Sequence, residues 1–333
     1  MHSPSGGLDP SQAARIGFRF STADFPERDQ LTAWREIFGR TVCNLDIDPM
    51  NSEDFRAEAT IRRFPGLGVL VGSSSGVRLL HPKELIVDDD LSFMTGPMQN
   101  WMAYQHGRVS TLGSGQGVLM NNAEVGGITM PSETSFITFR VPVAAIAPLV
   151  PDVGALIAKP VPSDSEALRL LTRYFRALTE EPLPTTPELQ RAVATHVYDL
   201  LALALGATYE AAEIAKGRGV RAARVQVILA EIRSRFGEPG FSPADVAAKL
   251  GISTRHVQDL LYDTDMTFSE RVTDLKLGKA HAMLLSSSDA CKIIEIAHAC
   301  GFGDVSYFNR SFRRRFGVSP SELRGQRSRD SEP

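Results

Sequence analysis

Two short stretches near the end of this 333-residue chain carry polar side chains at helical spacing that suit hydrogen bonding to the edges of DNA bases. If each stretch is a helix with its apolar residues turned inward, the outward positions are Thr254, Arg255, Gln258 and Asp259 in the first and Val305, Ser306, Asn309 and Arg310 in the second. Arginine pairs well with guanine, asparagine and glutamine pair with adenine, and valine can contact the thymine methyl group; each good bidentate pair discriminates by about 1–3 kcal/mol. These residue types predict recognition of double-stranded DNA.

The apolar residues of the same stretches define the opposite face of each helix. Val257, Leu260 and Leu261 in the first, and Phe308 and Phe312 in the second, recur at the spacing of one helix face. We therefore predict that these five side chains lie in a core and hold the polar face outward.

One residue departs from this pattern. When the two stretches are aligned, Gln258 matches Asn309 and Asp259 matches Arg310. A carboxylate at Asp259 repels phosphate, but it can accept a hydrogen bond from the cytosine amino group. Either it contacts cytosine, or the first helix contributes little to sequence choice. We favour the second interpretation, in which the second helix supplies most of the specificity.

The two stretches belong to a pattern that occurs twice, over Ser242–Leu261 and over Ile293–Phe312. In each copy an alanine stands four residues before a glycine, Ala247 before Gly251 and Ala297 before Gly301. A small alanine allows two helices to cross closely, and a glycine after a helix adopts the left-handed conformation at little cost. Two tandem helix–turn–helix units joined by one helix are predicted, with Ser253 or Thr254, and Asp304, capping the second helix of each.

Three consecutive arginines, Arg313, Arg314 and Arg315, end the second polar helix. A run of like charges is usually a solvated face. At the end of a DNA-contacting helix we instead expect these guanidinium groups to bind backbone phosphates, which contributes affinity and salt dependence rather than sequence choice.

The charge of the chain is divided unevenly. The net charge is −3 overall, but residues 216–333 contain 19 Lys and Arg against 14 Asp and Glu, a net charge of +5, whereas residues 1–215 carry −8. Chance unevenness is the alternative to a polyanion partner for the second half. The three cysteines, Cys43, Cys291 and Cys300, form no C-x-x-C pair and indicate reduced thiols. Neither a secretory signal nor a membrane span is predicted, so we expect a cytoplasmic protein that does not bind membranes.

Periodicity along the chain predicts an α+β protein with two domains. We expect residues 1–15 to be disordered and 16–205 to form a sensing and dimerisation domain, with an antiparallel barrel or sandwich over about 16–145 and a helical hairpin over about 164–205. A linker over 206–219, an all-helical domain over 220–325 and a tail over 326–333 follow. The helices of that domain are expected at 220–236, 242–250, 253–263, 267–286, 292–300, 304–316 and 320–325.

The segment G-F-G-D-V-S-Y-F-N-R-S-F-R-R-R-F-G-V-S-P-S-E-L-R, from Gly301 to Arg324, closely resembles the AraC/XylS family of bacterial transcription regulators. The resemblance covers roughly 220–325, and the earlier part is similar, more loosely, to the ligand-sensing or activator-binding domain of one AraC subgroup, a cupin-like fold. It implies two helix–turn–helix units held about one DNA turn apart, each placing its second helix in the major groove. It also implies promoter DNA and RNA polymerase as partners, and an effector or dimer contact in the N-terminal domain.

A small-molecule effector would need a cavity in the N-terminal domain. Four aromatic residues and a histidine in the strand-rich region are candidates for its lining, namely Phe93, Trp101, Tyr104, His106 and Phe136. Packing in the core is the alternative for each of them. The scattered histidines and cysteines provide no metal-ligand set, and no cofactor is predicted.

We therefore predict a sequence-specific DNA-binding transcription regulator, an activator that forms a homodimer and is not an enzyme. One alternative is an architectural DNA-binding protein without ligand sensing. A second is a hydrolase with an appended DNA-binding domain, based on the G-x-S-x-G match at 72–76. That motif requires a helix after the serine, whereas V-R-L-L-H-P predicts a strand, so we interpret 72–76 as a turn.

Overall fold

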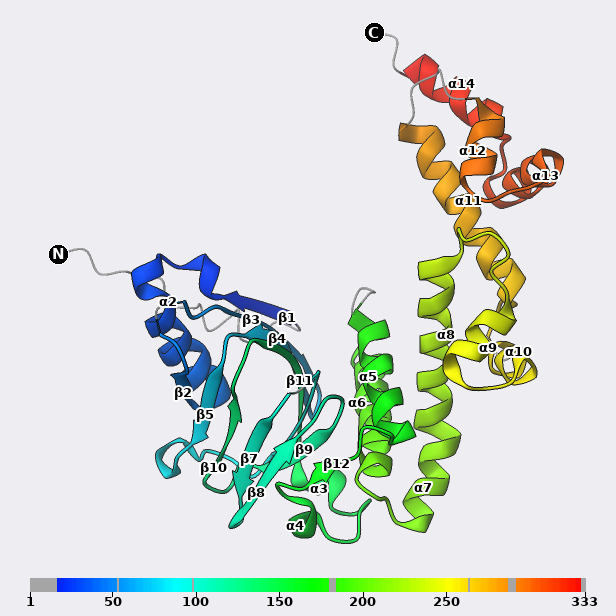
Figure 1. Ribbon diagram of the computed structural model, residues 1–333. Helices are drawn as coiled ribbons and strands as arrows, with labels where there is room; N and C mark the ends of the chain where they lie inside the picture. The colour runs from blue at the N-terminus through cyan, green and yellow to red at the C-terminus, as the bar shows by residue number, and fades with distance from the viewer. Residues whose placement is uncertain are drawn as a thin grey trace. The chain divides into compact units, whose positions relative to one another are not determined.

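The computed structural model describes residues 17–52, 54–97, 99–179, 184–262, 264–286 and 292–330 (Figure 1). The predicted disorder of residues 1–15 lies outside these ranges. The chain divides into two compact units, Met1–Ala223 and Arg224–Pro333.

The strands of the N-terminal unit form two antiparallel sheets, so the predicted barrel or sandwich is an open sandwich and not a closed barrel. The first sheet, in spatial order, contains β1 (Gly17–Ser21), β3 (Ala57–Phe64), β4 (Leu67–Ser74), β11 (Thr134–Val141), β6 (Leu91–Thr95), β9 (Gly117–Asn121) and β12 (Pro160–Val161). The second contains β2 (Asp46–Pro49), β5 (Val77–His81), β10 (Gly126–Met130), β7 (Trp101–Gln105) and β8 (Arg108–Leu112).

The two faces of the first sheet have different environments because successive side chains of a strand point to opposite sides. On β11, Phe136, Thr138 and Arg140 line a cavity inside the sandwich. Phe139 points the other way, and its ring meets that of Phe175 edge-on at 5.5 Å. One face of the sheet therefore surrounds the cavity and the other is covered by a helix.

The helices of this unit lie mostly before β2 and after β11, with one short helix, η3, between β5 and β6. They are η1 (Thr22–Asp24), α2 (Glu27–Ala33), η2 (Trp34–Cys43), η3 (Lys83–Leu85), α3 (Val143–Ile146), α4 (Val153–Leu156), α5 (Glu166–Thr179), α6 (Pro187–Ala204), α7 (Tyr209–Ala215) and η4 (Lys216–Val220). The helical form changes at Trp34, from the α-helix of α2 to the wider π-helix of η2. The predicted linker over 206–219 is largely helical, through α7 and η4.

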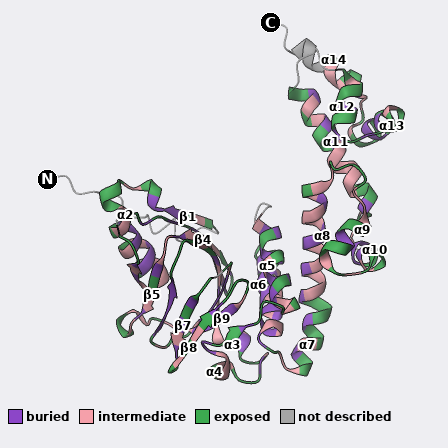
Figure 2. Ribbon diagram, viewed as in Figure 1, coloured by how far each residue is buried: buried purple, intermediate pink, exposed green. Residues whose placement is uncertain are grey.

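The predicted helical hairpin is present as α5 and α6. Its apolar side chains, including Leu171, Phe175, Val197 and Leu200, are buried within this chain (Figure 2). Packing inside one copy therefore accounts for much of the apolar surface of the two helices.

The C-terminal unit consists of helices whose bounds agree with the prediction to within one or two residues, except at the end. They are α8 (Arg221–Arg235), α9 (Pro243–Leu250), α10 (Thr254–Tyr262), α11 (Phe268–Ser286), α12 (Ile293–Ala299), α13 (Val305–Phe316) and α14 (Pro320–Asp330). The last helix was expected to end at residue 325 but continues five residues into the predicted tail.

These helices build two separate cores. Ile228 and Ile232 of α8 pack with α9 and α10, and Phe268 at the start of α11 joins this core. The second core holds α12 and α13 together with Leu284 near the end of α11. The helix α11 therefore inserts one end into each helix–turn–helix unit, as the sequence predicts.

The small residues of the repeat have the predicted roles. Ala247 is buried in the first core and Ala297 in the second. Gly251 has a φ of 69° and Gly301 a φ of 79°, both in the left-handed region.

The glycine geometry predicts opposite effects of the same substitution at two positions. Gly251→Ala places a Cβ in a left-handed residue, so we expect the C-terminal unit to lose about 1–2 kcal/mol of unfolding free energy. Gly278→Ala lies within α11, where an added Cβ meets nothing within 4 Å, and should gain about 0.5–1 kcal/mol. Urea unfolding followed by far-UV circular dichroism measures both, and equal shifts in the same direction would contradict the assigned conformations.

Candidate functional site

The first polar helix, α10, presents the predicted residues to solvent. Thr254, Arg255, Gln258 and Asp259 are exposed, whereas Val257, Leu260 and Leu261 are buried. The cap is Ser253, whose hydroxyl accepts a hydrogen bond from the backbone N–H of His256 at 3.1 Å. The fold thus separates a polar face from a buried face along this helix.

The second polar helix, α13, has the same division. Ser306, Asn309 and Arg310 are exposed and Val305 is half-buried. Phe308 and Phe312 are fully buried in the core of the second helix–turn–helix unit. The exposed positions therefore agree with the amphipathic pattern; their contacts with DNA remain a prediction.

Asp259, which departs from the pattern, has a partner on its own helix. Its carboxylate lies 4.0 Å from Nε of Arg255, one turn earlier. Both side chains are largely exposed, and such surface pairs contribute little stability. The effect of this contact is that the negative charge of Asp259 lies near a positive guanidinium group on the same helix.

The three arginines at the end of α13 are all exposed but are not equivalent. Nε of Arg315 donates a hydrogen bond to Asp274 of α11 at 2.5 Å, and the guanidinium lies over the ring of Phe316. Arg313 and Arg314 are exposed along the same helix. One of the three arginines predicted to contact phosphates is thus already engaged by a carboxylate of α11.

Two exposed aromatic residues on these helices were not identified from the sequence. Tyr262, at the end of α10, is 87% exposed, and Tyr307, in the first turn of α13, is 43% exposed. Large aromatic residues are often buried. An aromatic residue outside the apolar face of a predicted helix could therefore have identified these two exposed side chains from the sequence.

Asp304 caps α13 through its carboxylate, which accepts hydrogen bonds from the backbone N–H groups of Ser306 at 2.7 Å and Tyr307 at 3.0 Å. The bonds from Tyr307 and Ser306 hold the pKa of Asp304 below its usual range. Because the folded pKa is below the unfolded one, the stability that this group provides is present above the unfolded pKa. It is lost as pH falls through the folded pKa.

Two substitutions at Asp304 separate the cap from its charge. Asp304→Asn keeps an acceptor, so near neutral pH it should be closer to wild type than Asp304→Ala. The difference in melting temperature between wild type and Asp304→Asn should shrink as the pH is lowered through the acidic range. Thermal unfolding by circular dichroism at several pH values measures this difference, and a constant difference would contradict a charge-dependent cap.

The N-terminal unit contains a cavity of about 590 Å³ between the two sheets. Apolar side chains from η2 and from both sheets form most of its wall, among them Phe38, Ile47, Val69, Ile128 and Met130. This volume lies in the range of small-molecule sites, which are typically apolar with a few polar groups.

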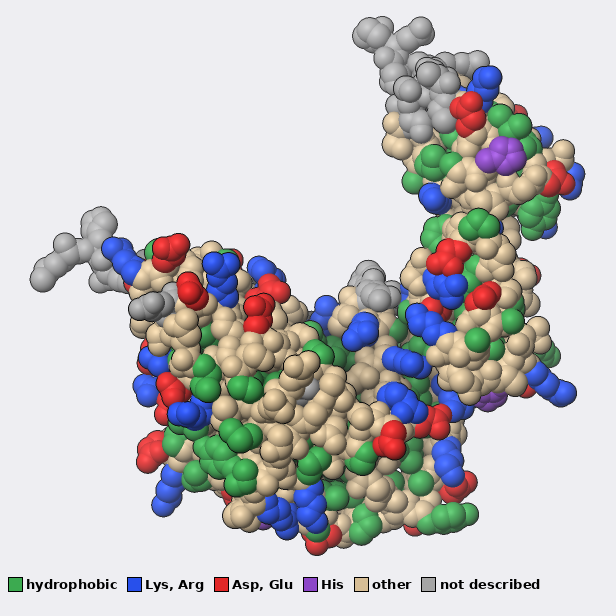
Figure 3. Space-filling model, in the orientation of Figure 1, with side chains coloured by type: hydrophobic (Ala, Val, Ile, Leu, Met, Phe, Trp, Pro, Cys, Tyr) green, Lys and Arg blue, Asp and Glu red, His purple; other side chains and the backbone are tan. Residues whose placement is uncertain are grey.

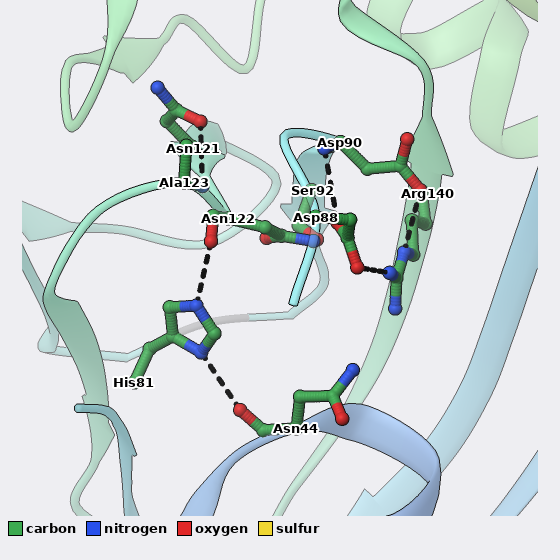
Figure 4. Close-up of polar contacts among 9 residues, drawn as sticks. All are labelled: Asn44, His81, Asp88, Asp90, Ser92, Asn121, Asn122, Ala123 and Arg140. Carbon is green, nitrogen blue, oxygen red and sulfur yellow. Dashed lines mark hydrogen bonds and ion pairs between the residues drawn. The ribbon is translucent and has the colours of Figure 1, made fainter. Parts of the chain in front are cut away.

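The polar residues of the cavity include two separate groups of contacts, one around Arg140 and one around His81 (Figure 4). The guanidinium of Arg140 donates hydrogen bonds to the carboxylates of Asp88 and of Asp90, the latter at 2.9 Å. The two ring nitrogens of His81 lie 2.8 Å from the backbone oxygens of Asn44 and Asn122. The charged groups at this end of the cavity are therefore already paired.

Most of the predicted cavity residues lie elsewhere, and only Phe136 of the five is in the wall. Phe93 is buried on the face of β6 opposite Ser92 and Met94, against Gly117. Trp101 is buried outside the cavity, and Tyr104 lies over Gly127 on the outer face of its sheet. His106 lies in the β7–β8 turn, 2.5 Å from a carboxylate oxygen of Glu124.

Cys43, which is half-buried, is a cavity residue that the sequence did not identify. Burial raises the pKa of its thiol to about 12, although Arg140 and Arg63 act in the opposite direction. The thiol is therefore uncharged near neutral pH.

The G-x-S-x-G motif is not a nucleophile elbow. Ser74 is the last residue of β4, a two-residue turn follows, and β5 then runs antiparallel to β2 and β10. Residues 72–74 therefore belong to β4, and only 75 and 76 form the turn that was predicted over 72–76. The residues after this turn are a strand, as predicted, whereas the motif requires a helix. Over the described residues there is no cluster of three or more His, Cys, Asp or Glu that could hold a metal. No described helix is both long and apolar enough to cross a membrane.

Comparison with known proteins agrees with this geometry. Residues 34–206 match the AraC-binding-like domain family and residues 246–326 match the helix-turn-helix domain family. The chain belongs to the AraC family of transcription regulators.

Three relatives illustrate the extent of the similarity. The transcriptional activator RhrA of Rhizobium meliloti is 30% identical over 59% of this chain and 61% of its own length. The transcriptional activator NphR of a Rhodococcus species is 26% identical over 89% of both chains. Among solved structures, the AraC-like transcriptional activator CuxR aligns over 80% of this chain and 96% of its own, with 15% identity and a TM-score of 0.49.

Proposed function

We propose that this protein is a sequence-specific DNA-binding activator of transcription. The observation that carries the proposal is that two helices with exposed polar faces, α10 and α13, are held on separate cores by one shared helix. With 19 residues, α11 is about 28 Å long, close to the roughly 34 Å of one DNA turn. The two polar helices would then enter successive major grooves on one side of the duplex.

Each exposed residue receives a role by its chemistry. Thr254, Arg255, Gln258 and Asp259 of α10, and Val305, Ser306, Asn309 and Arg310 of α13, would face base edges. Arg313 and Arg314 would bind phosphates, with Arg315 contributing less because Asp274 already holds it. Basic and acidic side chains are interspersed on the visible face of the C-terminal part (Figure 3), so affinity would depend on local contacts rather than on one uniform patch.

We also propose a cellular location and three further partners: RNA polymerase, a small-molecule effector and a second copy of the chain. The protein would act in the cytoplasm, bind near promoters and present a surface to RNA polymerase; the relative NphR, a transcriptional activator by name, supports the activator role. A small-molecule effector would occupy the cavity of the sandwich. A homodimer would form through apolar side chains that one copy leaves exposed, such as Leu189 of α6 and Tyr209 and Ile214 of α7.

A DNase I footprint on the DNA upstream of the protein's own coding sequence tests this function. We expect two protected segments whose centres are about 10 base pairs apart on one side of the duplex. Thr254→Ala/Gln258→Ala should weaken protection of one segment, and Asn309→Ala/Arg310→Ala protection of the other. Uniform protection of any DNA would instead support an architectural DNA-binding protein.

A further inference from the structure

We infer that the cavity of the sandwich takes an uncharged, largely apolar molecule with a hydrogen-bonding group at one end. This rests on the proposed role of the cavity as an effector site and names the chemistry of the effector. The apolar wall excludes an extensively polar molecule, because polar groups buried without partners are costly.

The charged residues of the cavity explain why the ligand carries no net charge. Arg140 is shared between Asp88 and Asp90, and all three side chains are between 26% and 32% exposed. A carboxylate ligand would compete with these two carboxylates for Arg140, and a cationic ligand would compete with Arg140 for the two carboxylates. Removing one partner of a partly buried ion pair costs more than forming the pair contributes.

The other polar groups suit an uncharged ligand. Arg63, the second arginine in the wall, is exposed to solvent, where its charge is screened. The two ring nitrogens of His81 lie 2.8 Å from the backbone oxygens of Asn44 and Asn122, so the imidazole is directed at the protein backbone. Asn44 and Asn122 provide amide groups, which bind hydroxyl or carbonyl groups without a charge.

Displacement of Nile red, an uncharged fluorescent dye, from the full-length protein tests the ligand class. The competitors are three naphthalene derivatives of similar size: 1-naphthalenemethanol, 1-naphthoate and 1-naphthylmethylammonium. We expect the alcohol to displace the dye at a concentration at least tenfold lower than either ion. Equal or stronger displacement by the carboxylate, or no displacement by any of the three, would overturn the assignment.

Cavity-filling variants locate the dye. Ile128→Trp and Met120→Trp place an indole in the cavity wall and should abolish dye binding, whereas Met102→Trp, on an exposed outer position, should not. Unchanged dye binding in both filled variants would place the dye elsewhere and overturn the inference. Loss of specific DNA binding is a separate result that bears on the proposed function alone.

A second inference rests on different contacts. We propose that two consecutive residues of α6, Tyr198 and Asp199, connect the cavity to the segment that leads into the DNA-binding unit. Through this route, a ligand in the proposed effector site would act on the DNA-binding unit.

Tyr198 contacts the edge of the cavity. Its hydroxyl donates a hydrogen bond to the backbone oxygen of Gly66, which lies in the β3–β4 turn and is part of the cavity wall. Gly66 has a φ of 75°, and a Cβ there would lie 2.6 Å from the Tyr198 hydroxyl oxygen. Burial, and then the charge of Asp90 in the same wall, raise the pKa of Tyr198.

Asp199 holds the segment that precedes α8. It is 2% exposed and accepts two hydrogen bonds from Arg218 of η4, at 2.8 and 2.7 Å. The neighbouring Gly219 has no room for a side chain, because a Cβ would lie 2.6 Å from that of Asp199. η4 is π-helical, a form often found at functional sites, and continues directly into α8.

The two contacts move together because both residues are on one rigid turn of α6. A displacement of the β3–β4 turn by a ligand would push Tyr198, and with it the carboxylate that fixes η4. Since α8 supplies Ile228 and Ile232 to the first helix–turn–helix core, a change at its start would reach the DNA-binding unit along the chain.

Hydrogen–deuterium exchange of the full-length protein tests this connection without a ligand. Gly66→Ala drives a methyl group against the Tyr198 hydroxyl, so backbone amides at 216–224 should exchange several-fold faster. In Gly66→Ala/Tyr198→Phe the next ring atom is 3.9 Å away, so exchange should return to the rate of Tyr198→Phe alone. The control is Gly107→Ala, which has a similar φ of 68° but nothing within 4 Å.

The outcomes are distinct. Faster exchange at 216–224 in Gly66→Ala, reversed by Tyr198→Phe and absent in Gly107→Ala, supports the connection. Equal exchange in Gly66→Ala and Gly107→Ala, or no reversal by Tyr198→Phe, would overturn it. Neither result depends on whether the protein binds DNA specifically.

Discussion

Phe312→Ala is expected to lower the unfolding free energy of the C-terminal unit by about 3–5 kcal/mol. Phe312 is fully buried, with its ring centre 5.6 Å from that of Phe308, 4.6 Å from Phe316 and 6.2 Å from His281. Truncation leaves a cavity that these rings cannot fill without moving. Domains of this size are typically stable by only about 5–15 kcal/mol, so much of the folded population of this unit should be lost.

Two spectroscopic signals separate the units in this experiment. Both tryptophans, Trp34 and Trp101, are in the N-terminal unit, so their fluorescence follows that unit alone. In urea, the helical circular dichroism signal should show an earlier transition for Phe312→Ala, while the tryptophan midpoint stays unchanged. Tyr307→Ala, which removes a half-exposed ring from the same helix, should cost about 0.5 kcal/mol. Equal effects of the two substitutions would mean that α13 is not packed as described.

Arg310→Ala is expected to remove most of the preference of the second helix–turn–helix unit for its specific site over unrelated DNA. An exposed arginine on α13 that pairs with guanine contributes about 1–3 kcal/mol, which corresponds to roughly a 5- to 150-fold weaker binding to the specific site. Binding to unrelated DNA should weaken much less. Arg313→Ala is the control, because a phosphate contact should weaken both kinds of DNA alike and lower the salt dependence by about one counterion.

Asp259→Ala is the complementary substitution on α10. We expect only a small change in specific binding, because the carboxylate faces Arg255. A small change is also what we expect if the first helix–turn–helix unit contributes little to sequence choice. The assignment of specificity fails if Arg310→Ala leaves site binding intact and Asp259→Ala abolishes it.

The C-terminal unit could be predicted from the sequence because local signals there agree with one another. The apolar spacing of Val257, Leu260 and Leu261 identifies one face of a helix, and Gly251 and Asp304 mark where helices end and begin. The choice between Ser253 and Thr254 as the cap could not be made, since both can accept the same backbone hydrogen bond.

The cavity could not be predicted because strand alternation does not say which face is enclosed. Ser92 and Phe93 are neighbours on β6, yet Ser92 lines the cavity and Phe93 does not. Only the pairing of β6 with β9 and β11, and the helices on the far side, decide this. Large aromatic residues therefore indicated the core rather than the cavity.

The segment predicted as a linker shows a second limit. Glycines at 206, 217 and 219 suggested an irregular connection, but Gly219 lies in a helical segment where Asp199 leaves no space for a side chain. The reason for this glycine is a contact with a residue 20 positions earlier, and no local pattern reveals it.

Fluorescence anisotropy of the full-length protein on its own upstream DNA, against scrambled DNA of the same length and over a series of salt concentrations, tests the central claim most directly. We predict tighter binding to the upstream DNA by a factor of about 10³ or more, with affinity for both falling steeply as salt rises. Equal affinity for both DNAs at every salt concentration would contradict a sequence-specific regulator.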